Sequence, residues 1–194
     1  MSRQRIGVFG GSFNPVHKGH VAVARAFMAE VGLDMLYVIP TNISPLKDTL
    51  AASGEDRLNM LRIAFEGVEG AILSDLELER KGVSYTCDTV KALRGIYPKA
   101  RLYYLIGDDW LKGFTRWREY GYILDNVRLT VANRSGRDIS AEVREFNKET
   151  GKRALVMKNK AVVVSSSDFR TCADPELLPA GVYEYIKERG LYGL

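Results

Sequence analysis

The sequence predicts a three-layer α/β fold in which helices cover both faces of a doubly wound parallel sheet. Short apolar runs alternate along the chain with segments whose apolar residues recur at helical spacing. The apolar runs are continuous rather than alternating, which is typical of strands that are buried on both faces. Strand, helix and strand in repeated succession form right-handed βαβ units, and such units build a parallel sheet.

The first third of the chain follows this order. Residues 5–9 (RIGVF) form a short apolar run that favours a strand, and residues 20–32 have the apolar spacing of a helix. Residues 35–40 (MLYVIP) again predict a strand. The polar segment 41–54, with its proline, serine and asparagine, is expected to be a loop.

The remaining elements continue the alternation. Helical spacing predicts helices over residues 56–67 and 85–97, and the run AILSDLEL at 71–78 predicts a strand between them. Three further apolar runs are expected to be buried strands, and they lie at residues 101–107, 127–133 and 161–165. No repeat, low-complexity stretch or linker divides the 194 residues, so one domain over 1–194 is expected.

The composition, with 46% hydrophobic and 27% charged residues, is ordinary for a soluble globular protein. No apolar run approaches the roughly 20 residues that span a bilayer, and residues 1–5 lead directly into the first strand without a signal peptide. Cys87 and Cys172 form no C-x-x-C pair. We therefore expect two buried free thiols, a cytoplasmic location and no membrane partner.

The net charge of +4 is a mild excess that suits an anionic small molecule. The chain has no basic tail, no run of five like charges and no recognition motif for nucleic acid. Charge therefore favours phosphate-bearing ligands slightly, and no nucleic-acid partner is expected.

Four polar clusters lie directly after predicted strands: GGSFNPVHKGH, PTNISPLKD, GDDW and SSSDFR. In doubly wound sheets, ligands bind beyond the carboxyl ends of the strands, near the point where the strand order reverses. The four clusters are therefore expected to line one edge of the sheet together.

The glycines of the first cluster do not match a dinucleotide fingerprint. That motif needs a second glycine two residues after the first, whereas Val8 and Phe9 separate Gly7 from Gly10. The second predicted strand also lacks a terminal acidic residue for an adenosine ribose. Hydride transfer is disfavoured, and what remains is a turn in which Gly10 and Gly11 let backbone N–H groups approach a phosphate.

The chain's two histidines, His17 and His20, lie at i and i+3, so a helix start near them turns both to one side. Three interpretations are open. They are surface histidines, a zinc pair without a visible third ligand, or imidazole donors to phosphate oxygens at a helix N-terminus. A neighbouring phosphate favours the imidazolium form.

These motifs resemble those of a known family. GGSFNPVHKGH resembles the G-x-F-x-P-x-H-x-G-H signature of the (T/H)-x-G-H nucleotidyltransferases, and SSSDFR resembles their second signature at the other end of the chain. Within that superfamily, the sequence is similar to the bacterial nicotinate-nucleotide adenylyltransferases. The segments that carry this similarity are YTCDTVKAL, GDDW, RWREYGYIL, ANRSG and VYEYIKERGLY. The resemblance covers essentially the whole chain and implies a Rossmann-like nucleotidyltransferase domain.

The resemblance implies a reaction in NAD biosynthesis between ATP and nicotinate mononucleotide. The 5′-phosphate of the mononucleotide attacks the α-phosphate of ATP, and pyrophosphate leaves. The attacking phosphate is already anionic, so the protein supplies position and charge stabilisation rather than a base. Mg²⁺ is expected to be carried by the ATP phosphates and water, with no protein ligand.

The same resemblance implies roles for individual residues. Four are expected to act in catalysis, and they are His17, His20, Lys47 and Arg170. The residues expected against ATP are Gly10, Gly11, Ser12, Phe13, His17, His20, Gly107, Asp109, Ser165, Ser166 and Arg170. Those expected against the acceptor are Tyr85, Thr86, Thr89, Trp117 and Arg134. The family pattern G-x-D favours Asp109 over Asp108 for the ATP ribose.

Three departures and three alternatives accompany this interpretation. Asn14 and Ser167 stand where Asp and Thr are usual, and Leu46 replaces a frequent histidine beside Lys47. The alternatives are an adenylyltransferase for phosphopantetheine, one for nicotinamide mononucleotide, and a nucleotide-sensing module without turnover. The oligomeric state is open, with a homo-oligomer as one candidate.

Overall fold

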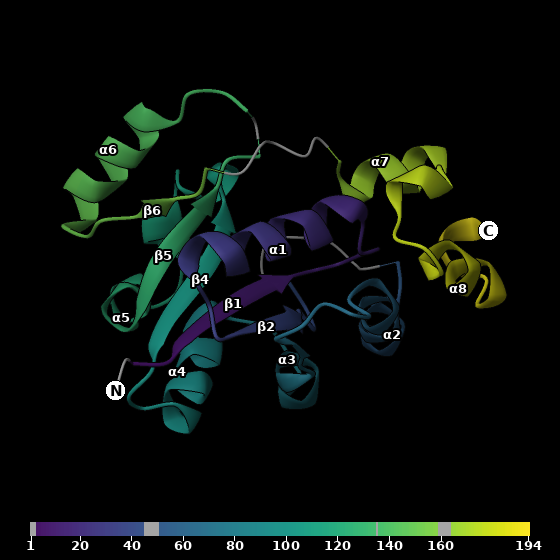
Figure 1. Cartoon of the computed structure of the whole chain (residues 1–194), viewed down its shortest axis with the longest axis horizontal. Coiled ribbons are helices and arrows are strands. Elements are labelled where there is room, and N and C mark those ends of the chain that lie inside the picture. Colours follow the sequence, from purple (N-terminus) through teal and green to yellow (C-terminus); the bar gives the residue numbers. More distant parts are fainter. Residues whose placement is uncertain (1–2, 45–50, 135, 159–163) are drawn as a thin grey trace.

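The computed structural model describes residues 3–44, 51–134, 136–158 and 164–194. In this part of the chain, six parallel strands form one sheet in the order β3-β2-β1-β4-β5-β6 (Figure 1). The strands are β1 (Arg5–Gly11), β2 (Met35–Pro40), β3 (Ala71–Leu73), β4 (Arg101–Gly107), β5 (Val127–Ala132) and β6 (Leu155–Val156). The strand order reverses between β1 and β4, so the predicted doubly wound sheet is confirmed, with its switch point there.

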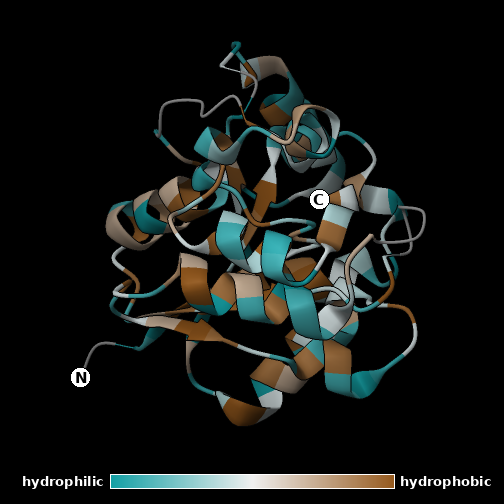
Figure 2. Ribbon diagram, turned by 90° about the vertical axis from the view of Figure 1, so that its right-hand side faces the viewer, coloured by the Kyte–Doolittle hydropathy of each residue, from teal (hydrophilic) through white to brown (hydrophobic). Residues whose placement is uncertain are grey.

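Helices cover both faces of the sheet. They are α1 (Lys18–Val31), α2 (Gly54–Ala64), α3 (Leu76–Arg80), α4 (Thr86–Ile96), α5 (Tyr120–Asn126), α6 (Ser140–Thr150), α7 (Ser166–Cys172) and α8 (Val182–Glu188). One buried cluster joins α1, α2, α7 and α8 to the sheet, and a second joins α4, α5 and α6 to its other face. The helix ribbons in Figure 2 carry both teal and brown stretches, as amphipathic covering helices do.

Helix α1 packs closely against β1 because of Gly7. A Cβ atom at this position would lie 2.4 Å from the Cδ1 atom of Leu33 and 2.9 Å from the ring of Phe27. Phe27 is fully buried. The glycine therefore sets how closely the helix that carries His20 approaches the central strand.

Two predicted strands differ in the structure. The run 71–78 is a strand only over Ala71–Leu73, because the Ser74 hydroxyl accepts from the Leu76 N–H (3.3 Å) and α3 then begins. The last strand within the described residues is β6 at Leu155–Val156, which pairs with β5 and was not predicted. Of the predicted strand 161–165, residues 161–163 lie outside the described residues, and Val164 and Ser165 are not in a strand.

Cys87 is buried, as expected, whereas Cys172 is exposed, so the prediction of two buried thiols is wrong for Cys172. It lies in the last turn of the short helix α7, whose buried side chain is Phe169. None of the helices in the described ranges combines the length and apolar composition that crossing a bilayer requires.

Candidate active site

A cavity of about 610 Å³ opens at the carboxyl edge of the sheet, around the switch point between β1 and β4. Its wall comes from the β1–α1 connection, the ends of β4 and β5, and the start of α7, which Figure 1 shows beside the start of α1. The sequence-predicted residues that line it are Gly10, Gly11, Ser12, Phe13, His17, His20, Gly107, Trp117, Arg134, Ser165, Ser166 and Arg170. Both signature motifs therefore meet at one site.

The turn after β1 is shaped by close aromatic packing. A Cβ atom on Gly10 would lie 2.8 Å from the Tyr104 hydroxyl, and one on Gly11 would lie 3.1 Å from the Phe13 ring. Phe13 is buried in the left-handed backbone region (φ 45°), which favours glycine. Its ring meets that of His20 edge-on, with centroids 4.9 Å apart. The glycines let the chain turn tightly over this ring and bring its backbone to the cavity wall.

His17 and His20 together cap the N-terminus of α1. The His20 N–H donates to Nδ1 of His17 (3.3 Å), and the His17 N–H donates to Nδ1 of His20 (3.1 Å). This is a capping box in which two imidazoles replace the usual serine and glutamate. Because each Nδ1 is an acceptor, the proton of a neutral ring lies on Nε2, which makes Nε2–H a donor. The rings stack with centroids 3.6 Å apart.

The zinc interpretation of the histidine pair gains no support in the described ranges. The group of ligand-type side chains that clusters there is Cys87, Asp88 and Glu119, which includes neither histidine. The interpretation that the two are surface histidines does not fit His17, which is buried. The pair is therefore a helix cap that lines the cavity.

The imidazole of His17 is held in its neutral form. Burial, with a smaller effect of the Arg134 cation, lowers the pKa of His17 to about 4, against a weaker opposing effect of Asp168. At neutral pH, the group that this protein offers to a ligand is thus a neutral Nε2–H donor. This differs from the expected imidazolium, which required a phosphate beside it.

The second motif caps α7 in the same way. The Asp168 N–H donates to the Ser165 hydroxyl (3.1 Å), and the Ser165 N–H donates to the Asp168 carboxylate (2.8 Å). These hydrogen bonds lower the pKa of Asp168, so its carboxylate is ionised at the helix start. Two helices thus begin at the cavity, each with a closed capping box.

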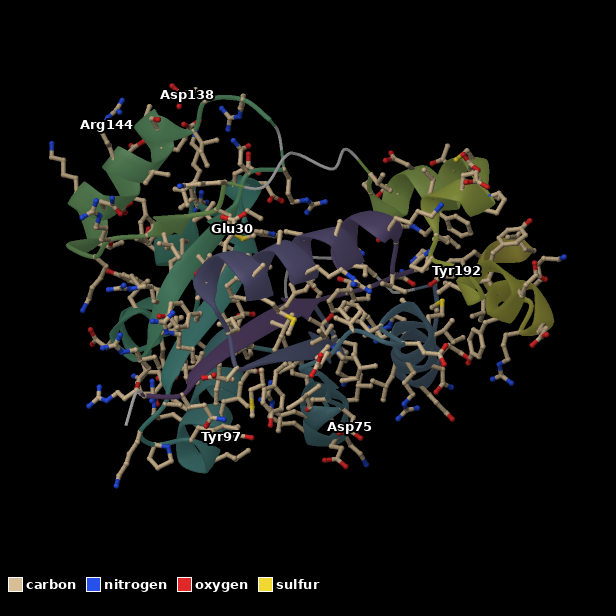
Figure 3. The ribbon with its side chains drawn as sticks, in the orientation of Figure 1. Glu30, Asp75, Tyr97, Asp138, Arg144 and Tyr192 are labelled. Atoms are coloured by element: carbon tan, nitrogen blue, oxygen red, sulfur yellow. The ribbon has the colours of Figure 1, made fainter. Side chains whose placement is uncertain are left out.

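Hydrogen bonds join the two motifs although they are far apart in sequence. The Ser166 hydroxyl donates to the Pro15 carbonyl (2.8 Å), and Nη1 of Arg170 donates to the Asn14 carbonyl (2.6 Å). The Tyr192 hydroxyl donates to the Asn14 side chain (2.9 Å). Figure 3 labels Tyr192 where the start of α1 meets the C-terminal segments. Asn14 and Pro15 are thereby held from both the α7 side and the C-terminal side.

Comparison with known proteins places the chain in a family. The family model described as cytidylyltransferase-like matches residues 8–172, which include both capping boxes. The chain belongs to the cytidylyltransferase-like family.

Curated relatives of this cytidylyltransferase-like chain carry one activity in their names. A probable nicotinate-nucleotide adenylyltransferase of Neisseria meningitidis serogroup A is 34% identical over 97% of this chain and 98% of its own length. One from Bordetella petrii is 37% identical over 97% and 99%. A Plasmodium falciparum nicotinic acid mononucleotide adenylyltransferase complexed with NaAD has TM-score 0.80 at 20% identity, with 97% of each chain covered. The expected family and fold are confirmed.

The two aspartates after β4 have different surroundings in this cytidylyltransferase-like site. Asp108 is buried and accepts from the Arg134 N–H (2.9 Å), so it fixes the loop that brings Arg134 to the cavity. Asp109 is exposed. Its carboxylate lies so close to Gly107 that a Cβ atom there would be 2.2 Å from its Oδ1 atom. Gly107 lines the cavity and Asp109 does not, so Asp109 lies at its margin. Its contact with the ATP ribose stays a prediction.

Of the residues predicted to contact the acceptor, Trp117 and Arg134 line the cavity. Trp117 packs on Phe114 with centroids 4.8 Å apart and meets Trp110 edge-on at 5.9 Å. The Trp117 indole is fixed by these two rings and still lines the cavity, so it is suited to stack on an aromatic ring of a ligand. Trp110 belongs to the same wall and was not among the predicted residues.

Tyr85, Thr86 and Thr89 do not line the cavity. The Thr86 hydroxyl lies 3.2 Å from that of Tyr104, which does line it, so the start of α4 lies one side chain behind the wall. Thr89 is buried and donates to the Glu77 carboxylate (2.6 Å). Thr89 therefore joins the first turn of α4 to α3 and does not reach the cavity.

Lys47 and Leu46 lie outside the described residues, so the role of Lys47 stays a prediction. Sequence analysis missed Arg57, which is 1% exposed in α2. Its Nη1 donates to the Ser12 carbonyl (2.9 Å) and its Nε to the Ala52 carbonyl (3.3 Å). Burial lowers the pKa of this guanidinium. Its charge thus stabilises the back of the β1–α1 turn.

The neutral His17 predicts a pH dependence of stability. Its pKa is about 4 in the folded chain and 6.5 in the unfolded one, so the unfolded state binds more protons between these values. The stability contributed by His17 is complete above pH 6.5 and is lost as the pH falls toward 4. We expect the free energy of unfolding to drop by about 2 kcal/mol between pH 7 and 4.5 from this residue alone.

Urea unfolding at pH 7 and pH 4.5 measures this drop. His17→Asn is the matched variant, because asparagine keeps the N-cap acceptor but does not titrate. Protonation of carboxylates lowers the free energy of unfolding equally in the wild type and the variant. The difference between their two decreases, from pH 7 to pH 4.5, is therefore the contribution of His17. Equal drops in the wild type and the variant would contradict the prediction.

Proposed function

We propose that this chain transfers the adenylyl group of ATP to nicotinate mononucleotide at the cavity between α1 and α7. One observation carries the proposal: two capped helix N-termini, with His17, His20 and Arg170 between them, face one cavity at the switch point. Helix N-termini, imidazole Nε2–H groups and a guanidinium together suit a triphosphate. The names of the curated relatives support the same activity.

The chemistry needs no protein base. An oxygen of the mononucleotide 5′-phosphate forms a bond to the α-phosphorus of ATP, the bond from that phosphorus to the bridging oxygen breaks, and pyrophosphate leaves with the electron pair. The dinucleotide formed is nicotinate adenine dinucleotide. The N–H donors of His17 and His20 stabilise the negative charge that builds on the α-phosphate oxygens, and Arg170 balances the charge of the leaving group.

The donor set fits a divalent cation that ATP itself carries. The described lining residues of the cavity include no aspartate or glutamate. The clustered Cys87, Asp88 and Glu119 lie elsewhere, and Lys91 already contacts Glu119 (2.7 Å). We therefore propose Mg²⁺ held by phosphate oxygens and water, without a protein ligand; when bound, it neutralises phosphate charge.

The start of α4 lies behind the Tyr104 side chain of the cavity wall, and it is proposed to recognise the carboxylate of the nicotinate when the acceptor reaches past that side chain. The N-cap residue Tyr85 has no side-chain capping hydrogen bond, so the first N–H groups of α4 are not satisfied by their own cap. A carboxylate is favoured at such a helix end by hydrogen bonding and by the helix dipole. A neutral amide in its place still accepts a hydrogen bond but carries no negative charge, so it gains less from the helix dipole, which favours the acid over nicotinamide mononucleotide.

The test is release of pyrophosphate from ATP and Mg²⁺ with each of three acceptors: nicotinate mononucleotide, nicotinamide mononucleotide and phosphopantetheine. We expect kcat/KM for the acid to exceed that for the amide at least about tenfold, which corresponds to about 1.4 kcal/mol. Preference for either other acceptor would contradict the proposed substrate. Nucleotide binding without release under any acceptor would contradict adenylyl transfer itself.

Three further expectations accompany the proposal. We propose that residues 1–194 form one nucleotidyltransferase domain and that the chain works in the cytoplasm, with ATP and nicotinate mononucleotide as its small-molecule partners and neither nucleic acid nor membrane. A homo-oligomer stays a candidate. Light scattering of the purified protein and its fractionation from cells test these points.

A further inference from the structure

A second cavity, of about 570 Å³, lies at the amino edge of the sheet, at the opposite end from the first. Its lining includes the residues around the starts of β4 and β5 and the end of α4, which Figure 1 shows near the N-terminus. Strand β4 has 7 residues between the two edges, which corresponds to roughly 20 Å. The two cavities are therefore separate sites.

The second cavity holds a concentration of positive charge. Seven lysine and arginine side chains line it, against a single carboxylate, that of Asp125. Its formal charge of +6 exceeds the +4 of the whole chain, so the rest of the chain is net negative. Such a concentration in a concave, partly apolar site focuses the electrostatic field on an anion.

Most of these cations have no carboxylate partner in the described ranges. Lys152 is paired with Asp125 (2.7 Å). Arg94 donates to the backbone carbonyls of Ala100 and Asn126, while its buried Nε finds no acceptor in the described ranges. The other five neither form an ion pair nor donate a side-chain hydrogen bond there, and they are Arg3, Lys99, Arg101, Arg128 and Arg153.

The strand register brings three of these cations together. Arg128 pairs with Tyr103 across β4 and β5, and Arg101 is two residues before Tyr103, so both arginines lie on one face. Arg153 is two residues before Leu155, whose partner Thr130 is two residues after Arg128, so Arg153 continues the same row. Arg101, Arg128 and Arg153 are exposed, so water and salt screen part of their mutual repulsion, and an anion bound between them relieves more of it.

We propose that this cavity binds a phosphoanhydride anion, a di- or triphosphate that is either inorganic or part of a nucleotide. The volume of the cavity falls in the range of small-molecule sites. Its lining charge of +6 favours a ligand that carries several negative charges. Arginine forks match phosphate oxygens in pairs.

The test is calorimetric titration of the full chain with tripolyphosphate and, separately, with ATP. We expect the wild type to bind two ligands. In Arg101→Glu/Arg128→Glu, the first cavity should bind as before, and the affinity of the second cavity should fall at least about tenfold. The matched control is Arg25→Glu/Arg62→Glu, which makes the same charge change at exposed positions of α1 and α2 and keeps both sites. Tripolyphosphate binding supports an inorganic source, and binding of ATP alone supports a nucleotide.

Two further variants make the test independent of folding and of the proposed function. Arg101→Gln/Arg128→Gln neutralises the same positions without reversing them and is checked by circular dichroism. His20→Ala/Arg170→Ala weakens the first cavity and is expected to keep the second site. Two sites in every variant, a single site in the wild type, or binding of a 20-nucleotide RNA at the second cavity with neither small anion bound there, would overturn the proposal.

Discussion

Replacement of His20 by alanine is expected to lower kcat about 10²–10³-fold while the chain stays folded, because one hydrogen-bond donor to a charged transition state contributes on that scale. The Nδ1 atom of His20 is engaged by the His17 N–H, which directs its remaining N–H, Nε2, away from the cap. His20 lines the cavity that both motifs share. Pyrophosphate release at saturating ATP and nicotinate mononucleotide measures kcat.

The same substitution also opens the capping box, so a control must separate the two effects. His20→Gln keeps an acceptor for the His17 N–H, as glutamine does in an ordinary capping box. We expect His20→Ala to lose about 1 kcal/mol of unfolding free energy, and His20→Gln to recover most of it without recovering kcat. Unchanged kcat in His20→Ala would remove this residue from the mechanism.

Replacement of Arg57 by methionine is expected to lower the free energy of unfolding by about 2–4 kcal/mol and to lower kcat as well. The substitution nearly keeps the side-chain volume but leaves the Ser12 and Ala52 carbonyls without their donors. Ser12 belongs to the turn that lines the cavity, so a shift of its backbone displaces the ligand. Urea unfolding and pyrophosphate release measure the two effects.

The matched control is Arg62→Met in the same helix, since Arg62 is exposed and, among the described residues, donates to the nearby Asn59 alone. A change within about 0.5 kcal/mol is expected there. Arg57→Lys keeps the charge and one donor, so it should recover part of kcat. Equal effects of Arg57→Met and Arg62→Met would contradict the role given to Arg57.

The central sheet was predictable because its strands are continuous apolar runs. RIGVF, MLYVIP and RLYYLIG lie in β1, β2 and β4, where both faces are covered by helices. Prediction failed at the sheet edges. Strand β3 has 3 residues and β6 has 2, and both are set by pairing with a neighbour rather than by their own composition.

The candidate site was predictable as a set of motifs but not as a set of contacts. The spacing of His17 and His20 indicated one side of a helix, yet imidazoles are not the residues that usually cap helices, so the box was not foreseen. Arg57 carries a charge that sequence reasoning assigns to a solvated face. The family resemblance implied that Thr89 contacts the acceptor, but its hydroxyl donates instead to Glu77, which belongs to another helix.

The hydrogen bonds that join Asn14 and Pro15 to Ser166, Arg170 and Tyr192 span 151, 156 and 178 residues of chain. Contacts between such distant segments form late, because the loop between them must first be ordered. A chain growing on the ribosome therefore completes β1, α1 and most of the sheet before these partners exist. The cavity is expected to be assembled only after residues 166–192 have been synthesised, so a shorter nascent chain does not carry a finished site.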